Sequence, residues 1–345
     1  MQRILIGIKK VPQKWFGGLF WVFLISCVIV FGKGELLKKI EVGNVSAIYN
    51  TINNFIPDIC NNKALKIILP TLAIICALCY VISKFYKERL ILIKHLSLNF
   101  NIAEVDPKFL KQYYVKEFEI SQCDLMSDPD NYEKAIEIQD NTVNEICKTR
   151  HSQKLGYYGI AHIPLIFRLG YKIGDENNVK LLHKKRNNES FFEELENTED
   201  FSPLFKISEE NKTKKSNELL ISIATSRPIN ENELASLNKK DIHYLKFEID
   251  SIGFDSVLSY KRAERLRNQI MDSVREACKK YGIIRIHLAI ASSSVFIFFL
   301  AQAFSPQHDP EIIVYHFIRG EYPWGIIEHE KPENALVLNQ NHKNS

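Results

Sequence analysis

The sequence lacks the local signatures of the common enzyme and metal-site classes. It contains no HExxH zinc-protease motif, no GxSxG nucleophile elbow, no phosphate-binding P-loop and no acidic cluster at metal-ligand spacing. An enzyme would need a site that leaves no trace in the sequence. We therefore expect a protein that is not an enzyme and that has no catalytic residues, no metal ligands and no cofactor.

Cysteine is sparse and irregularly placed. The seven cysteines are odd in number and scattered, which favours free thiols in a reducing compartment over a disulfide framework. Cys76 and Cys79 have CxxC spacing, but they lie in an apolar run with no histidine or second cysteine pair nearby. Their spacing therefore indicates apolar packing and not a metal or redox site.

A strong net charge is also absent, because the formal charge of the whole chain is only +4. The average hides an asymmetry. Up to Arg89 there are twelve Lys and Arg residues against four acids, which leaves 33 basic and 37 acidic residues in the larger part. A mildly acidic soluble part argues against broad nucleic-acid binding, which needs a field of basic side chains facing the phosphates. One small anionic ligand in a local pocket is still compatible with it.

Two long uncharged runs are present near the N-terminus. Trp15 to Gly32 and Ile67 to Ser83 contain no charge over eighteen and seventeen residues. A helix needs ~17 to 25 residues to cross a ~30 Å hydrocarbon core, so each run can just span a bilayer. The alternatives are a cleaved signal peptide for the first run and a buried core helix for the second. We predict two transmembrane helices, at about 15–32 and 65–83.

Basic residues flank both runs on their outer sides. They are Arg3, Lys9, Lys10 and Lys14 before the first run, and Lys84, Lys87, Arg89 and Lys94 after the second. Both flanks are therefore expected in the cytoplasm, as is the soluble domain of this multi-pass protein. Residues from Tyr80 to about Leu98 are expected to continue as one helix or stalk out of the membrane.

The soluble part shows the pattern of an α/β fold. Short apolar runs rich in β-branched or aromatic residues alternate there with longer amphipathic segments. The candidate strands are Leu155 to Ala161, Val179 to His183, Glu218 to Ala224, His243 to Ile249, Ile283 to Ala291 and Glu311 to Phe317. The clearest helix is Val257 to Tyr281, and a second is Asn131 to Thr149.

Two stretches repeat one plan of strand, short turn, apolar helix and strand. The first has the turn His162 to Pro164 and a helix from Leu165 to Ile173; the second has the turn Ser292 to Ser294 and a helix from Val295 to Phe304. Each turn opens a helix N-terminus, where free backbone N–H groups and the helix dipole favour an anion. The plan predicts a two-lobed site facing phosphates. The alternative is an ordinary turn in which the serines only cap the helix.

The segments GYYGIAHIPLIFRLGYKIGD with VKLLHKKR, and IIRIHLAIASSSVFIFFLAQAF with EIIVYHF and EYPW, resemble the two halves of SAVED domains. The resemblance implies a sensor made of two fused CARF-like, Rossmann-type units. With two membrane helices ahead of it, the chain looks like the two-transmembrane SAVED effectors of CBASS anti-phage systems. The expected organisation is a membrane region at 1–89, a linker or stalk at 90–130, the sensing domain at 131–335 with units 131–217 and 218–335, and a tail at 336–345.

The resemblance also implies a ligand, a cyclic di- or trinucleotide, and places its contacts at the strand ends. The expected ligand-binding residues are His162, Pro164, Arg168, Thr225, Ser226, Arg227, Ser292, Ser293, Ser294 and Phe296. Phe296 is expected to stack on a base. For Arg168 and Arg227 a surface salt bridge is an equal alternative. Many SAVED domains have a proline in the second turn, where this sequence has the serine run.

The resemblance implies that the ligand drives homo-oligomerisation and that the clustered helices disrupt the bacterial inner membrane. The partners expected are therefore the cyclic nucleotide, the lipid bilayer and further copies of the chain, with no long nucleic acid. Two alternatives are a membrane-tethered scaffold or receptor for a protein partner, and a ring nuclease that degrades a cyclic nucleotide.

Overall fold

The computed structural model describes residue 71 and residues 87–99, 103–150, 153–174, 179–185, 191–211, 216–239 and 241–338. The chain divides into two compact units, Met1–Lys87 and Glu88–Ser345. The membrane helices expected at about 15–32 and 65–83 lie, apart from residue 71, outside the described residues and stay a prediction. No helix within the described residues has both the length and the apolar character needed to cross a membrane.

The first half of the second unit contains a six-stranded sheet with the order β2-β6-β5-β4-β1-β3, in which β1, β3, β4 and β5 are parallel. Its strands are β1 (Glu88–Leu96), β2 (Glu104–Val105), β3 (Tyr113–Ser121), β4 (Lys154–Ile160), β5 (Lys180–His183) and β6 (Phe191–Glu194). Its helices are α5 (Pro107–Leu110), α6 (Tyr132–Thr149) and α7 (Ile163–Ile173), with short 3₁₀ turns at Leu125–Ser127 and Pro129–Asn131.

The second half contains a seven-stranded sheet with the order β13-β12-β11-β10-β8-β9-β7, and its four central strands are parallel. Its strands are β7 (Lys206–Asn211), β8 (Glu218–Ala224), β9 (His243–Glu248), β10 (Arg285–Ala291), β11 (Glu311–Ile318), β12 (Glu321–Ile327) and β13 (Leu336–Leu338). Its helices are α8 (Glu231–Ala235), α9 (Tyr260–Tyr281), α10 (Ser294–Ala301) and α11 (Pro332–Ala335). The predicted α/β class is confirmed, and the strands and helices predicted between 131 and 317 are present, with ends at or within a few residues of the predicted ones.

The duplicated plan is confirmed as well. In the first half α6 leads into β4, α7 and β5, and in the second half α9 leads into β10, α10 and β11. The repeat extends further back than the sequence showed, because β1 and β8 occupy the same position beside β4 and β10. In the register, Leu96 pairs with Ile160 and Ala224 pairs with Ala291. Each half is therefore one Rossmann-type unit.

The segment expected as a helix or stalk is a strand where the structure describes it. Glu88–Leu96 form β1, which lies between β3 and β4 within the first sheet. Leu90 and Leu92 face one core, and Ile91 and Ile93 face the other. A strand buried on both faces reads as a continuous apolar run, which periodicity cannot distinguish from a helix. The region expected as a linker, 90–130, therefore contains most of β1 and all of β3, and the first Rossmann-type unit begins at Glu88.

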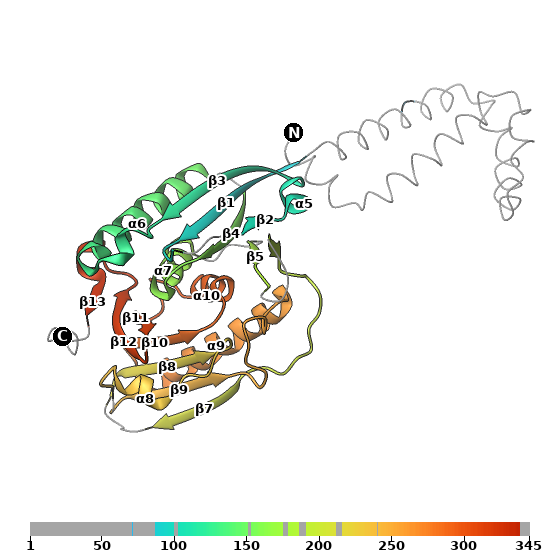
Figure 1. Cartoon of the computed structure of the whole chain (residues 1–345). Coiled ribbons are helices and arrows are strands. Elements are labelled where there is room, and N and C mark those ends of the chain that lie inside the picture. Colours follow the sequence, from blue (N-terminus) through green and yellow to red (C-terminus); the bar gives the residue numbers. More distant parts are fainter. Residues whose placement is uncertain are drawn as a thin grey trace, which may run out of the picture. The chain divides into compact units, whose positions relative to one another are not determined.

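Helices α7 and α10 lie between the two sheets and form the centre of the domain (Figure 1). A helix in this position is covered on all sides, which explains why α10 is apolar around its whole circumference. The two helices cross closely at Gly170, where an added Cβ would lie 2.3 Å from the carbonyl oxygen of Phe298. The ring of Phe298 also stacks on Tyr157 of β4, with ring centroids 4.1 Å apart.

Candidate functional site

The carboxyl ends of both sheets lie on one face of the domain. Two contacts between the halves show this. The ring of His162, which follows β4, lies 4.5 Å from the ring of His316 near the end of β11. In a second contact, Nε2 of His183 at the end of β5 lies 3.1 Å from Oδ1 of Asp255 in the loop after β9. We call this surface the carboxyl-end face. It is the side on which open parallel sheets bind their ligands.

Each half builds a similar hydrogen-bonded corner on this face. In the first, the backbone N–H of Ser97 donates to the carbonyl of Ile160 at 3.2 Å, and Ser97 Oγ contacts His162 Nδ1 at 2.6 Å. In the second, the backbone N–H of Thr225 donates to the carbonyl of Ala291 at 2.9 Å, and Thr225 Oγ1 contacts Ser292 Oγ at 2.7 Å. By register Ser97 corresponds to Thr225 and Ile160 to Ala291, whereas the side-chain partners differ by one position: His162 is the N-cap of α7, and Ser292 precedes Ser293, the N-cap of α10.

The corners sit at the N-termini of α7 and α10. Pro164 occupies the first turn of α7, where its missing N–H costs little, and His162 is the N-cap without a side-chain cap bond. Ser293 is the N-cap of α10, Ser294 is the first helical residue, and Ser293 Oγ is buried without a partner. Helix N-termini carry unpaired N–H groups and positive dipole ends. The two corners therefore offer a pair of matched anion-accepting positions.

Two buried histidines and one half-buried histidine gather behind the first corner. This histidine cluster consists of His95, His162 and His316. Burial lowers the pKa of His95 and His162 to about 4 and that of His316 to about 3, so all three are neutral at pH 7. The ring of Trp324 lies 5.1 Å from that of His316, and its Nε1 is buried without a partner. The cluster therefore adds no charge to the carboxyl-end face at pH 7.

Arg168 does not face this site. Its side chain is fully buried, and each of its five N–H groups has a partner. Nε and NH2 bind the two carboxylate oxygens of Asp140 at 2.9 and 2.7 Å, and the other three N–H groups donate to the carbonyls of Ile327, Glu328 and Glu330. Arg168 therefore clamps α7 to α6 and to the end of β12. It is neither the expected ligand contact nor a surface salt bridge.

Arg227 does lie at the carboxyl-end face, directly after β8 and Ser226. Its NH1 donates to the carbonyl of Pro228 at 2.8 Å and to Glu233 Oε2 at 2.9 Å, and its guanidinium lies 3.8 Å above the ring of Phe317. About a third of the side chain is exposed. The backbone N–H of Ser226 is held by the carbonyl of Ala291 at 3.0 Å. Arg227 is oriented by its neighbours and still reaches solvent.

The expected role of Phe296 does not agree with the structure. Phe296 is fully buried in the core between the sheets, because α10 is enclosed on all sides. A base cannot reach its ring in this conformation. Of the other expected contacts, Thr225 and Ser292 lie together, and His162, Pro164, Ser293 and Ser294 lie at the two helix N-termini. Sequence reasoning missed Ser97, since the strand that carries it was not recognised.

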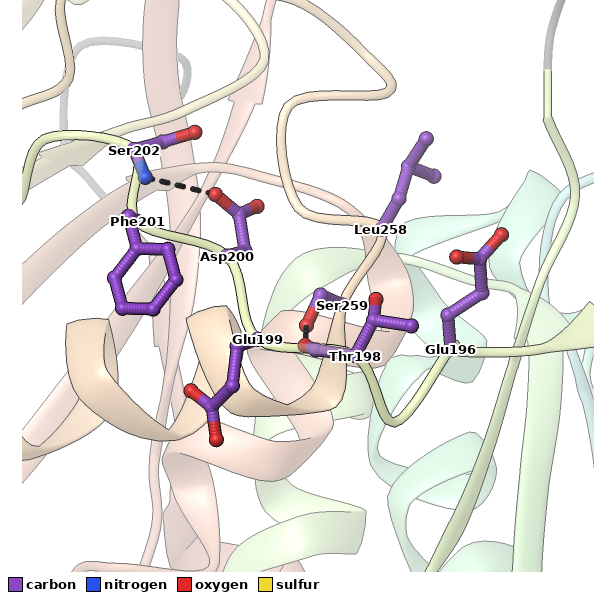
Figure 2. A pocket seen from close by; sticks show the side chains of 8 residues that line it. All are labelled: Glu196, Thr198, Glu199, Asp200, Phe201, Ser202, Leu258 and Ser259. Carbon is purple, nitrogen blue, oxygen red and sulfur yellow. Dashed lines mark hydrogen bonds between the residues drawn. The ribbon is translucent and has the colours of Figure 1, made fainter.

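A hollow of about 380 Å³ opens near the N-terminus of α9, and Figure 2 shows its lining. Its walls carry three carboxylates, from Glu196, Glu199 and Asp200. Hydrogen bonds from Ser202, whose N–H is 2.9 Å from Asp200 Oδ1, lower the pKa of Asp200, so this carboxylate stays ionised. Two of the three have a basic partner, Arg262 at 3.5 Å from Asp200 and Lys185 at 3.8 Å from Glu196. The lining itself carries no basic side chain, which disfavours a phosphate in this hollow.

Comparisons with known proteins agree with this fold. A family model described as the SMODS-associated and fused to various effectors sensor domain, SAVED, matches residues 138–327. No curated protein matches the chain. Among solved structures, the Acinetobacter baumannii Cap4 SAVED/CARF-domain containing receptor with the cyclic trinucleotide 2′3′3′-cAAA is similar at a TM-score of 0.50 and 16% identity, covering 81% of this chain and 63% of that one. The same receptor with 3′3′3′-cAAA matches at 0.48 and 14%, covering 81% and 66%. This chain spans less than two thirds of the length of each.

Proposed function

The chain belongs to the SAVED family of sensor domains, and we propose that it is the receptor of a membrane effector that binds a cyclic oligonucleotide on its carboxyl-end face. The observation that carries this proposal is the pair of similar corners, Ser97 with His162 and Thr225 with Ser292. A cyclic oligonucleotide repeats phosphate and base around a ring. Two matched corners on one face suit a ligand whose own groups repeat.

The chemistry of the face supports the same ligand class. Hydroxyl groups and the N–H groups of helix N-termini donate hydrogen bonds to phosphate oxygens without a large positive charge, and Arg227 adds a planar fork of donors at the edge. The domain is mildly acidic overall, which disfavours long nucleic acid but leaves room for a small ligand held by directed hydrogen bonds. The structures of the similar receptors were solved with cyclic trinucleotides, so these compounds are the first ones to test.

We further propose that the response is membrane disruption. In this proposal residues 1–89 form the membrane region, with helices at about 15–32 and 65–83, and the sensor lies in the cytoplasm. Ligand binding favours a form of the sensor that packs against further copies, and assembly brings pairs of membrane helices together. The ligand can shift the equilibrium toward the assembling form only by the difference between its binding free energies for the two forms of the sensor.

The decisive test is thermal unfolding of the full chain in lipid nanodiscs with a panel of cyclic nucleotides. The panel contains cyclic di-AMP, cyclic di-GMP, cyclic GMP–AMP and cyclic tri-AMP in its 3′3′3′ and 2′3′3′ forms. A specific ligand at a hundred times its Kd adds about 2.7 kcal/mol to the free energy of unfolding and raises the midpoint. Linear dinucleotides serve as the control. No shift with any member would overturn the receptor proposal and favour a scaffold for a protein partner.

Membrane action is tested separately with the ligand that the panel identifies. Liposomes that contain the full chain and a trapped dye should leak when the ligand is added. Recovery of the ligand intact afterwards would support a sensor, whereas its cleavage would support the ring-nuclease alternative. Ligand binding without leakage would remove the proposed membrane disruption and leave the receptor proposal standing.

A further inference from the structure

The start of the first sheet carries exposed basic residues. Arg89 is the second residue of β1, and Lys108 and Lys111 lie in and directly after α5, the short helix before β3. All three residues are exposed. We infer that these residues, the basic rim, bind the anionic lipid headgroups of the bilayer and thereby orient the sensor. The inference rests on the proposed function, because it assumes the two predicted membrane helices.

Contacts between α5, β3 and β1 bring the basic rim together. The ring of Phe109 in α5 packs on that of Tyr113 at the start of β3, with ring centroids 5.1 Å apart. Arg89 lies opposite Tyr114 in the register of β1 and β3. Lys111, the C-cap of α5, precedes the first residue of β3 by two positions. Figure 1 shows α5 beside the beginnings of these strands, so the three basic residues share one end of the first sheet.

The side chains of the basic rim are available to a ligand. Within the part of the chain that the structure describes, none of the three forms an ion pair. The neighbouring acid Glu88 is already bound by Lys154 at 2.6 Å. Asp106 is the N-cap of α5 and accepts the backbone N–H of Lys108 at 2.8 Å. Phosphate oxygens can therefore reach the guanidinium and ammonium groups of the rim without breaking an existing ion pair.

Basic residues are concentrated in this part of the chain. Residues 84–116 contain seven basic residues and three acids, whereas residues 117–345 contain 29 basic and 35 acidic residues. An anionic leaflet attracts basic segments next to a membrane span, and this attraction falls off within a Debye length of about 8 Å. The end of the domain that carries the basic rim is therefore attracted to an anionic bilayer, and the acidic remainder is not.

The connection between the rim and the predicted membrane helix is short. That helix is expected to end at about residue 83 and β1 begins at Glu88, so four residues separate them. Even fully extended, such a connection spans at most about 18 Å. It therefore keeps the rim at a high effective concentration near the headgroups, where weak individual contacts are enough to hold it.

Strand β1 relates the basic rim to the candidate ligand site. Its nine residues run from Glu88 at the rim to Leu96, and the next residue, Ser97, belongs to the first corner. At about 3.3 Å per residue the strand is about 30 Å long. Contact of the rim with the bilayer therefore points the carboxyl-end face toward the cytoplasm, where a soluble ligand reaches it. The opposite orientation would press the corner against the lipid.

The test compares the full chain in nanodiscs of phosphatidylcholine alone and of phosphatidylcholine with about 30% phosphatidylglycerol, because the anionic lipid supplies the attraction. The readout is hydrogen–deuterium exchange of residues 107–116. One basic side chain near an anionic surface contributes about fivefold to binding, so exchange should slow by at least about fivefold in the anionic discs. The difference should disappear at about 1 M salt, where the Debye length is only about 3 Å.

Variants of the full chain assign the effect to the rim. The triple variant Arg89→Gln, Lys108→Gln and Lys111→Gln should exchange at the same rate in both kinds of disc. Lys134→Gln is the matched control and should keep the difference. Lys134 is exposed and has no ion pair among the described residues, and it lies in the first turn of α6. Because α6 ends shortly before β4 begins, this turn lies at the other end of the sheet.

The outcomes separate this inference from the proposed function. If the wild type resists carbonate extraction from liposomes and yet exchanges at the same rate in both kinds of disc, only the inference about the rim fails. If carbonate releases the chain, the proposed membrane region fails and the inference fails with it. A loss of the difference in Lys134→Gln as large as in the triple variant would also overturn the inference, because the attraction would then depend on overall charge. The thermal midpoint of each variant in neutral discs checks folding.

Discussion

Replacing Arg168 by methionine is expected to destabilise the folded domain without any ligand present. Methionine keeps much of the apolar volume but removes five hydrogen bonds. It leaves the carboxylate of Asp140, whose side chain is 13% exposed, with only Lys172 at 3.6 Å, and it leaves three carbonyls without their donor. Removal of one partner of a buried ion pair typically costs about 3–5 kcal/mol, because the other charge stays buried.

The assay is urea unfolding of the full chain in nanodiscs, followed by circular dichroism and compared at fixed salt. Lys261→Met is the matched control. Lys261 is paired with Glu264 at 3.4 Å on the surface of α9, so its loss should cost at most about 1 kcal/mol. The double variant Arg168→Met with Asp140→Leu should be less destabilised than the sum of the two single variants, because no charge is then left unpaired.

A different pattern would refute this account of Arg168. If Arg168→Met unfolds within about 1 kcal/mol of the wild type and yet loses cyclic-nucleotide binding, Arg168 acts as a ligand contact, as the sequence first indicated. If the double variant is destabilised by the full sum, Asp140 is not the partner whose isolation carries the cost.

Three further predictions concern stability. Gly170→Ala should lower the thermal midpoint by the equivalent of about 1–3 kcal/mol, because the new Cβ would meet the backbone of Phe298; an unchanged midpoint would contradict the close crossing of α7 and α10. Burial raises the pKa of Glu328 well above its usual value, so the folded state holds a proton that the unfolded state releases above about pH 4.5. Glu328→Gln should therefore be more stable than the wild type at pH 8, with the difference vanishing near pH 4 in parallel urea titrations. The histidine cluster has folded pKa values near 3 to 4, below the unfolded value of about 6.5, so its contribution to stability is present above pH 6.5 and lost as the pH falls toward 4. His316→Gln should reduce this loss of stability at acidic pH. An unchanged dependence of the free energy of unfolding on pH would argue against burial of the histidine as the cause.

Much of the second half of the domain could be predicted from the sequence. Strand β8 was predicted with its observed ends, because Glu218–Ala224 is a short β-branched run bounded by polar residues. The long helix α9 was predicted from apolar residues at three- and four-residue steps, and its N-cap Ser259 and C-terminal Gly282 mark its ends. The repeat of strand, turn and helix at His162 and at Ser292 was visible for the same reason.

For the candidate site, the sequence predicted where the two turns lie but not which side chains near them face solvent. Local patterns located the two turns, because helix starts and strand ends depend on neighbouring residues. Whether a side chain near a turn points toward solvent depends on what packs against it from elsewhere in the chain. Phe296 illustrates this: it follows the serine turn almost directly, yet it is enclosed between the two sheets.

The sequence by itself determined the α/β class, the internal duplication, the resemblance to SAVED domains and the positions of both turns, since each depends on periodicity or on short-range chain chemistry. Only the tertiary structure decided that Glu88–Leu96 is a strand within the first sheet, that Arg168 is a buried clamp, and that Ser97 and Thr225 complete similar corners. The physical reason is distance along the chain. Arg168 donates to carbonyls about 160 residues away, and Ser97 meets His162 across 65 residues, so only the packing of whole units brings these groups together.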